Sequence, residues 1–310
     1  MEKRTNKTYH IRYFRVAATL TAVFVCVVVL VFVFLRDGSD VESNSSSQGE
    51  ADSLNAADSM AVNAQIKPQE HGMTDLKEKI KTKFAEYPGQ WSAYVKNLNT
   101  GEFFTINDRQ IYPASIIKLF ALGACYQQIH DGIIKEDDYY TYIYSMAVMS
   151  NNVAFNKMIW TIGRDYLTKW CHENGYANTS QYHGLSPADN AEGLATSDKP
   201  NETCASDVGR MLESIYRGEC VSKEASQKML KLLEQQHWVN KIPSGLPPNT
   251  HFANKTGDTA DYSHDGAIVY SQGADYIIVI MSENPMVSFQ QDHRFIEISK
   301  MVYEYFNPGG

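Results

Sequence analysis

The chain has 310 residues, an ordinary apolar content of 43% and a formal net charge of −8. This length suits one large domain or two small ones, with enough apolar side chains to bury a core. The acidic balance argues against a protein that coats nucleic acid, because such proteins are basic. No nucleic-acid partner is therefore expected.

The N-terminal segment has the pattern of a membrane anchor. An uncharged, mostly apolar run covers residues 16–35, long enough to cross the roughly 30 Å hydrocarbon layer of a bilayer as a helix. Five basic residues precede it: Lys3, Arg4, Lys7, Arg12 and Arg15. By the positive-inside rule, residues 1–15 are a cytoplasmic tail, and the chain after Arg36 lies outside the cell membrane. A cleaved export signal is the alternative, and it also exports the rest of the chain.

Residues 36–72 have the composition of a disordered linker. They are rich in Ser, Asn, Asp, Glu and Ala, and they contain no aromatic residue. Such a segment buries too little apolar surface to offset the entropy of ordering its backbone. The folded domain is therefore expected at residues 73–310.

The first elements of that domain are a helix and a hairpin. An apolar pattern with helical spacing begins near Thr74 and places Leu76, Ile80 and Phe84 on one face. Residues 91–95 and 103–106 then have the pattern of two strands, joined by turn residues.

A long helical stretch separates this hairpin from later strands. Residues 115–233 are mostly helical in pattern, strands are expected at 266–270 and 276–281, and residues 289–306 close as a helix. This order predicts an α+β fold, with an antiparallel sheet flanked by the N- and C-terminal helices and an inserted all-helical lobe.

The clearest helix of the lobe runs from Ser206 to Arg217, with Thr203 or Ser206 as its N-cap. Its length of roughly 18 Å separates Cys204 from Cys220 by more than a disulfide allows. Buried free thiols are the favoured interpretation for the four cysteines of the domain: Cys125, Cys171, Cys204 and Cys220.

Three short motifs in the domain carry side chains suited to chemistry. They are Ser115-Ile116-Ile117-Lys118 (S-x-x-K), Ser150-Asn151-Asn152 (S-x-N) and Lys255-Thr256-Gly257 (K-T-G). The first two patterns occur by chance in a chain of this composition, whereas K-T-G is rarer. Their context adds weight, because S-x-x-K follows the hairpin and opens an apolar helix, and K-T-G lies on a strand before a turn.

The motifs contain a nucleophile with a possible base. A serine hydroxyl is a weak nucleophile and needs a neighbouring base. Residues three apart at a helix start share a face, so Lys118 is expected beside the Ser115 hydroxyl. The Lys118 amine can act as base only if burial and a nearby cation such as Lys255 lower its pKa. Ser150 would relay a proton to a leaving nitrogen, and Lys255 would alternatively bind a substrate carboxylate.

The other motif residues suit substrate binding. Asn152 would orient a substrate amide, and Thr256 belongs to the strand that would lie along the substrate. Gly257 would let a substrate backbone lie against that strand without a side-chain clash. The backbone N–H groups of Ser115 and Asp258 would form an oxyanion hole.

These motifs in this order resemble those of the penicillin-recognising serine enzymes, the class A β-lactamases and penicillin-binding proteins. The resemblance covers residues 74–306, and the interval of 105 residues from Ser150 to Lys255 is similar to that of the class A enzymes. It implies the β-lactamase/transpeptidase-like fold. No zinc-ligand spacing or phosphate loop occurs, so no metal or cofactor is expected. No G-x-S-x-G elbow occurs either, so an α/β-hydrolase triad is unsupported.

One loop departs from the family pattern. Residues 186–190 read S-P-A-D-N where the family has E-P-x-x-N, whose Glu activates the water that releases the acyl group. Asn190 matches and is a candidate substrate-binding residue, but Ser186 stands at the Glu position. A serine hydroxyl cannot serve as that base near neutral pH. Three nearby carboxylates are candidates to replace it: Asp189, Glu192 and Asp198.

Three functions are compatible with these residues. The first is a membrane-anchored extracytoplasmic β-lactamase, in which Ser115 attacks the β-lactam carbonyl and water releases the product. The second is a penicillin-binding D,D-peptidase-type acyl hydrolase of cell-wall peptides with slow or no β-lactam turnover. The third is a non-catalytic extracellular module. Each has a small β-lactam or a peptidoglycan peptide as partner, and the membrane through its N-terminal helix.

Overall fold

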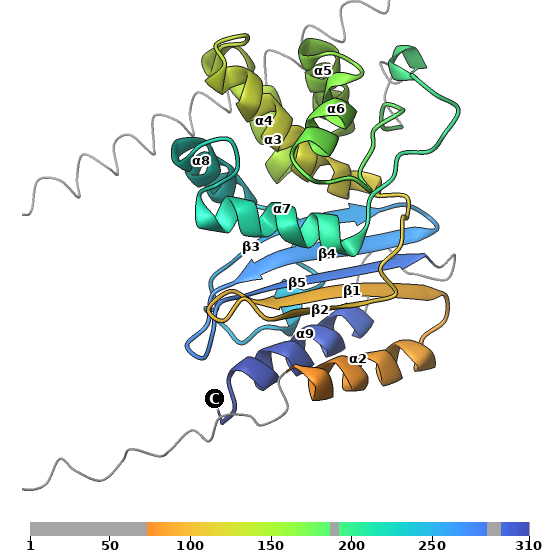
Figure 1. Ribbon diagram of the computed structural model, residues 1–310, viewed down its shortest axis with the longest axis vertical. Helices are drawn as coiled ribbons and strands as arrows, with labels where there is room; N and C mark the ends of the chain where they lie inside the picture. Colours follow the sequence, from red (N-terminus) through yellow and green to blue (C-terminus); the bar gives the residue numbers. More distant parts are fainter. Residues whose placement is uncertain (1–72, 187–191, 284–292, 310) are drawn as a thin grey trace, which may run out of the picture. The chain divides into compact units, whose positions relative to one another are not determined.

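A computed structural model describes residues 73–186, 192–283 and 293–309 (Figure 1). These residues form a five-stranded antiparallel sheet with helices on both of its faces. The predicted α+β fold class is therefore confirmed. The predicted membrane anchor at residues 16–35 and the linker at 36–72 lie outside the described ranges. Within those ranges, no helix is long and apolar enough to span a membrane.

The sheet has the strand order β2–β1–β5–β4–β3, with every neighbouring pair antiparallel. Its strands are β1 (Gln90–Asn97), β2 (Phe103–Ile106), β3 (Phe252–Asp258), β4 (Tyr262–Val269) and β5 (Tyr276–Glu283). The first two form the predicted hairpin. The strand predicted at 266–270 overlaps β4, which begins earlier at Tyr262, and the strand predicted at 276–281 lies within β5. The third motif lies on β3, an edge strand whose outer backbone groups are not used by the sheet.

Two helices cover one face of the sheet (Figure 1): α2 (Thr74–Glu86) and α9 (His293–Phe306). Leu76, Ile80 and Phe84 are all buried, as their spacing predicted. The ring of Trp91 on β1 lies 5.4 Å from the ring of Phe295 on α9, measured between centroids. This apolar layer explains why the first and last helices of the domain are neighbours.

The opposite face is crossed by α7 (Ala205–Arg217), which contacts β1, β4 and β5. The N-cap of this helix is Cys204, so the prediction of Thr203 or Ser206 was wrong. The first turn is instead satisfied from a distant segment, because Ser206 N donates to Asp108 Oδ1 at 3.1 Å. The Asp108 carboxylate, brought close by the tertiary fold, thus accepts a hydrogen bond that a local N-cap side chain would otherwise accept.

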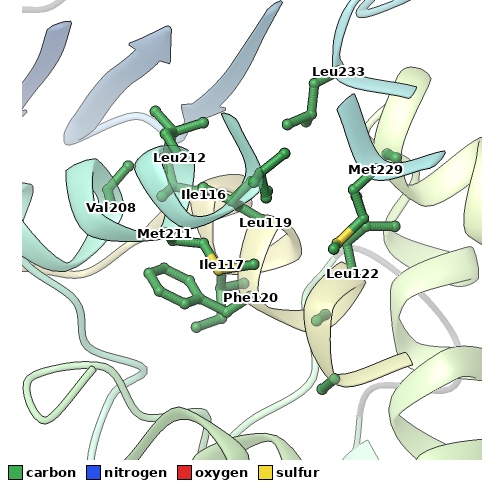
Figure 2. Close-up of a cluster of buried hydrophobic side chains, with 14 of the residues drawn as sticks. Ile116, Ile117, Leu119, Phe120, Leu122, Val208, Met211, Leu212, Met229 and Leu233 are labelled. Atoms are coloured by element: carbon green, nitrogen blue, oxygen red, sulfur yellow. The ribbon is translucent and has the colours of Figure 1, made fainter. Parts of the chain in front are cut away.

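The inserted lobe lies beyond α7. Its helices are α3 (Ile117–His130), α4 (Glu136–Val148), α5 (Asn152–Ile162), α6 (Tyr166–Glu173) and α8 (Lys223–Leu233), with single 3₁₀ turns η1 (Ala114–Ile116) and η2 (Glu192–Leu194). A third 3₁₀ turn, η3 (Pro243–Gly245), packs against α9 instead. Figure 2 shows apolar side chains of η1 and α3 gathered with those of α7 and α8, including Leu119, Leu212 and Met229. Because α3 is buried on nearly all sides, the turn that precedes it is held firmly.

The four cysteines of the domain are buried free thiols, as predicted. Burial raises the pKa of the Cys204 thiol to about 11 and that of Cys220 to about 12. Both thiols therefore stay protonated near neutral pH and contribute to packing rather than to nucleophilic chemistry.

Candidate active site

A cavity of about 610 Å³ lies beside β3 and brings the three sequence motifs together. It is lined by η1, the loop between α4 and α5, the first residues of α5, the loop after α8, and the end of β3. The lining residues are Ser115, Met149, Ser150, Asn151, Asn152, Val153, Trp238, Asn240, Thr256, Gly257 and Asp258. Eight of the nine residues predicted to act or bind here lie in this lining or contact it, with Lys118 and Lys255 just behind it. The ninth, Asn190, lies outside the described residues.

Ser115 lies in η1, which leads directly into α3. Ile116 N donates to Pro113 O at 3.0 Å and closes the turn. Ala114 has a φ of 46°, in the left-handed region that non-glycine residues rarely occupy. Such a conformation persists only where the surrounding structure enforces it, and the buried start of α3 does so here. The turn thereby holds the Ser115 side chain at the cavity.

Lys118 Nζ lies 2.7 Å from Ser115 Oγ, as the spacing of three residues predicted. The same amine donates to Ser150 O at 2.6 Å and to Asn152 Oδ1 at 2.7 Å. Lys118 is only 1% exposed. Burial, and then the positive charge of Lys255, lower the pKa of Lys118 to about 6. Most of this amine is therefore uncharged near neutral pH and able to accept the Ser115 proton.

Ser150 connects the two motif lysines. Its φ of 57° is also left-handed, and its carbonyl is turned toward Lys118. Its hydroxyl oxygen accepts a hydrogen bond from Lys255 Nζ at 2.9 Å and lies 3.4 Å from Lys118 Nζ. Burial lowers the pKa of Lys255 to about 7, against the opposing effect of two carboxylates. A hydrogen-bonded chain therefore runs from Ser115 through Lys118 and Ser150 to Lys255.

The outer edge of β3 presents a backbone donor to the cavity. Thr259 N donates to Tyr262 O at 2.9 Å across the β3–β4 turn. Because successive residues of an antiparallel pair point their N–H groups to opposite sides, the N–H of Asp258 points away from β4, toward the free edge. The N–H of Asp258 is therefore available as one of the two donors of the predicted oxyanion hole.

Gly257 allows β3 to approach the turn that carries the nucleophile. A Cβ atom at this position would lie 2.8 Å from Pro113 O, 2.9 Å from Ile116 N and 3.0 Å from Ser115 N. All three are backbone atoms, which cannot swing aside as a side chain would. The clearance at Gly257 was predicted for a substrate backbone, whereas in the structure it accommodates η1.

Asn152 links Lys118 to the loop that departs from the family pattern. Its Oδ1 accepts from Lys118, and its Nδ2 donates to Ser186 O at 3.1 Å. Ser186 itself is exposed. The predicted binding residue Asn190 and the alternative base Asp189 lie outside the described residues.

An apolar wall of the cavity was not predicted. Met149, Val153 and Trp238 line it with 45%, 52% and 49% of their surface exposed. The Trp238 loop is tied to the end of α4, because His237 N donates to Val148 O at 3.0 Å. The apolar residues on either side of the S-x-N motif are the signal that could have indicated this wall.

The assembled groups suit attack on an amide or ester carbonyl. A hydroxyl beside an uncharged amine provides a nucleophile with its base. Ser150, hydrogen-bonded to Lys255, can pass a proton to a leaving nitrogen. Two backbone N–H groups can stabilise the negative charge that develops on the carbonyl oxygen.

Comparison with known proteins identifies the family of this chain. The model of the β-lactamase enzyme family matches residues 75–143 and 141–306. No curated protein matches the sequence.

Solved structures share the fold. PBP-A is 22% identical with a TM-score of 0.67, over 76% of this chain and 97% of its own. A mutant of PBP-A in an acyl-enzyme complex with penicillin G is 22% identical with a TM-score of 0.67, over 78% of this chain and 99% of its own. A β-lactamase from Sphaerobacter thermophilus DSM 20745 is 17% identical with a TM-score of 0.66, over 76% of this chain and 98% of its own.

Proposed function

Because the chain belongs to the β-lactamase enzyme family, we propose that it is a penicillin-binding serine hydrolase in which Ser115 forms an acyl-enzyme. The observation that carries the proposal is the buried Lys118 amine, 2.7 Å from Ser115 Oγ with a pKa lowered to about 6. The substrate is a β-lactam or a cell-wall peptide amide. A module that only binds would have no need of a base beside this hydroxyl.

The acylation step uses each motif once. Lys118 takes the Ser115 proton as Oγ bonds to the carbonyl carbon, and the N–H groups of Ser115 and Asp258 stabilise the oxyanion. The carbon–nitrogen bond then breaks. The leaving nitrogen takes the Ser150 hydroxyl proton, and one proton from Lys255 replaces it. The proton that Lys118 took from Ser115 then passes along Ser150 to restore Lys255. The products are a Ser115 ester and an amine, which departs from a peptide substrate and stays attached to the acyl group of an opened β-lactam.

Release of the acyl group is proposed to be slow. Ser186 cannot activate water as a carboxylate would. Among the described residues lining the cavity, Asp258 is the one carboxylate, and it is paired with Lys241 at 2.5 Å. Asp198 is exposed and lies outside this lining. These observations favour the peptidase-type function, with a long-lived penicillin adduct. Rapid β-lactam hydrolysis is the second candidate, because the uncharged Lys118 amine is placed to activate a water molecule.

A time course of intact mass after exposure to benzylpenicillin tests this proposal. The unaltered protein is expected to gain the mass of one penicillin and to keep it for minutes or longer. In Ser186→Glu, a carboxylate next to Asn152 should shorten the adduct lifetime at least tenfold. Ser186→Gln matches that side chain in size without its charge and should leave the lifetime unchanged. Loss of the adduct within seconds from the unaltered protein would favour β-lactamase turnover instead.

The acylation rate should depend on pH in a bell-shaped way. Lys118 must be uncharged, so the rate should rise as pH increases through about 6. Lys255 must supply a proton to Ser150, so the rate should fall as pH increases beyond about 7. Because the two amines interact, the rising and falling limbs of the pH profile report apparent pKa values of Lys118 and Lys255 as a pair. Labelling by fluorescent penicillin from pH 4.5 to 9 measures the profile. A rate that still rises at pH 9 would mean that the Lys118 pKa is not lowered.

The same proposal includes a single-pass anchor at residues 16–35 and a catalytic domain outside the cell membrane. The support is the basic flank before the apolar run. After a carbonate wash of cell membranes, the full chain should stay in the pellet and a chain starting at residue 36 should not. Recovery of the full chain in the supernatant would argue for a cleaved signal.

A further inference from the structure

The apolar wall of the cavity has no role in the acylation step. Trp238 and Met149, which supply most of its surface, are 49% and 45% exposed although both side chains are large and apolar. Apart from Val153, the other described residues of the lining are polar or glycine. Exposed apolar surface that is concentrated in a cavity indicates contact with a ligand, because burial of such surface is favourable.

The backbone of Trp238 is fixed on both sides. Trp238 N donates to Gln236 Oε1 at 3.3 Å, and Trp238 O accepts from Asn254 Nδ2 at 3.2 Å. The Gln236 side chain is buried and donates in turn to Ala147 O at 2.9 Å. These hydrogen bonds hold the loop in the free protein, so a ligand that contacts the indole ring need not order its backbone.

The Trp238 loop lies at the Lys255 end of β3. Asn254, whose Nδ2 donates to Trp238 O, comes directly before Lys255 on this strand. Lys255 Nζ donates to Ser150 Oγ at 2.9 Å, and Ser150 is the proposed proton donor to the leaving nitrogen. The indole ring is therefore placed on the side of the cavity from which the leaving group departs.

Met149 reaches the same side from the lobe. It is the C-cap of α4 and directly precedes Ser150. His237 N donates to Val148 O at 3.0 Å, so the next residue of each chain segment, Trp238 and Met149, starts from a shared hydrogen bond. A substituent on a leaving nitrogen beside Ser150 would therefore meet these two apolar side chains.

We infer that Trp238 and Met149 form an apolar subsite for the leaving group of the substrate. The group that fits it is an aromatic or branched apolar side chain on the carbon bonded to the leaving nitrogen or oxygen. The preferred substrates are then amides or esters whose leaving group is an aromatic amino acid or hydroxy acid, rather than one with a methyl side chain. This inference rests on the proposed acylation of Ser115 and names the leaving-group class of that site.

Two esters test the inference on the unaltered protein: phenylacetylglycyl-D-lactate and phenylacetylglycyl-D-phenyllactate. Both give the same acyl group to Ser115, whose Oγ displaces the hydroxy acid while Ser150 supplies a proton to the leaving oxygen. The leaving groups differ only in a methyl or a benzyl side chain, and both keep their carboxylate, so its binding cancels from the comparison.

Competition between the two esters gives the expected preference directly. In an equal mixture at low conversion, the ratio of the released hydroxy acids equals the ratio of the second-order rate constants for acylation. After correction for alkaline hydrolysis without protein, the phenyllactate ester is expected to react about fivefold faster, because its ring packs against the wall as the ester bond breaks. The later fate of the acyl group does not affect this ratio.

Three variants locate the effect. Trp238→Ala removes the ring and should lower the ratio to about one, whereas Trp238→Phe keeps an aromatic ring and should retain about half of the preference or more. Phe103→Ala is the control, because it removes an aromatic ring that is 58% exposed on β2, at the opposite edge of the sheet from β3. It should leave the ratio unchanged.

The outcomes separate this inference from the proposed function. Equal reaction of the two esters, or no reaction of either with a protein that benzylpenicillin labels, would overturn the inference alone. An unchanged ratio in Trp238→Ala would also overturn it. Failure of all three compounds to acylate Ser115 would overturn the proposed function, and the inference with it. Because the competition experiment needs no variant, a loss of stability in Trp238→Ala does not prevent the test.

Discussion

Ser115→Ala is expected to abolish covalent labelling of the protein by benzylpenicillin. The substitution removes the one hydroxyl that lies 2.7 Å from the Lys118 amine at the start of α3. Without this oxygen no ester can form, and acylation should fall at least ten-thousandfold, below detection by intact mass. The fold should persist, because Ser115 is only partly buried and its side chain is small.

Ser197→Ala is the matched control for this result. The Ser197 hydroxyl accepts a hydrogen bond from Lys199 N in a loop away from the cavity. Labelling of this variant should equal that of the unaltered protein. An adduct on Ser115→Ala with the same rate and stoichiometry would place the nucleophile elsewhere and remove the basis of the proposed mechanism.

Lys118→Met is expected to slow acylation at least a thousandfold while it stabilises the fold. The loss follows from removal of the base beside Ser115. The gain follows from removal of a buried amine, because methionine is similar in length and apolar. We expect an increase of about 1–3 kcal/mol in the free energy of unfolding, part of the burial cost being offset by three lost hydrogen bonds.

The pH dependence of that gain distinguishes it from ordinary repacking. The pKa of Lys118 is about 6 in the folded protein and 10.5 in a solvated chain. Between these values the unfolded state binds more protons, so this group makes the unaltered protein less stable as pH falls. The advantage of Lys118→Met should therefore grow from pH 9 to pH 6 and level off below.

Urea unfolding at several pH values measures this trend, with Lys81→Met as the control. The Lys81 side chain is 60% exposed, so its replacement should change stability little and independently of pH. A constant difference between Lys118→Met and the unaltered protein from pH 5 to 9 would mean that the Lys118 amine is not perturbed by burial.

Local spacing in the sequence was enough to predict several elements correctly. The face of α2 formed by Leu76, Ile80 and Phe84 follows from helical periodicity, which needs no knowledge of the partner surface. The contact between Ser115 and Lys118 follows in the same way, since three residues make nearly one helical turn. The cap of α7 was predicted wrongly because Asp108, far away in the chain, does what a local serine or threonine usually does.

The amino-acid sequence by itself determined which groups are present and which of them are neighbours along one helix or strand, because backbone geometry fixes distances over a few residues. Only the tertiary structure decided that Ser150 and Lys255, 105 residues apart, share a hydrogen bond. It also decided that Lys118 is mostly uncharged and that Asp258 faces the cavity with Lys241 behind it. Burial and charge–charge distance set these properties, and both depend on surfaces that meet only when the chain has folded.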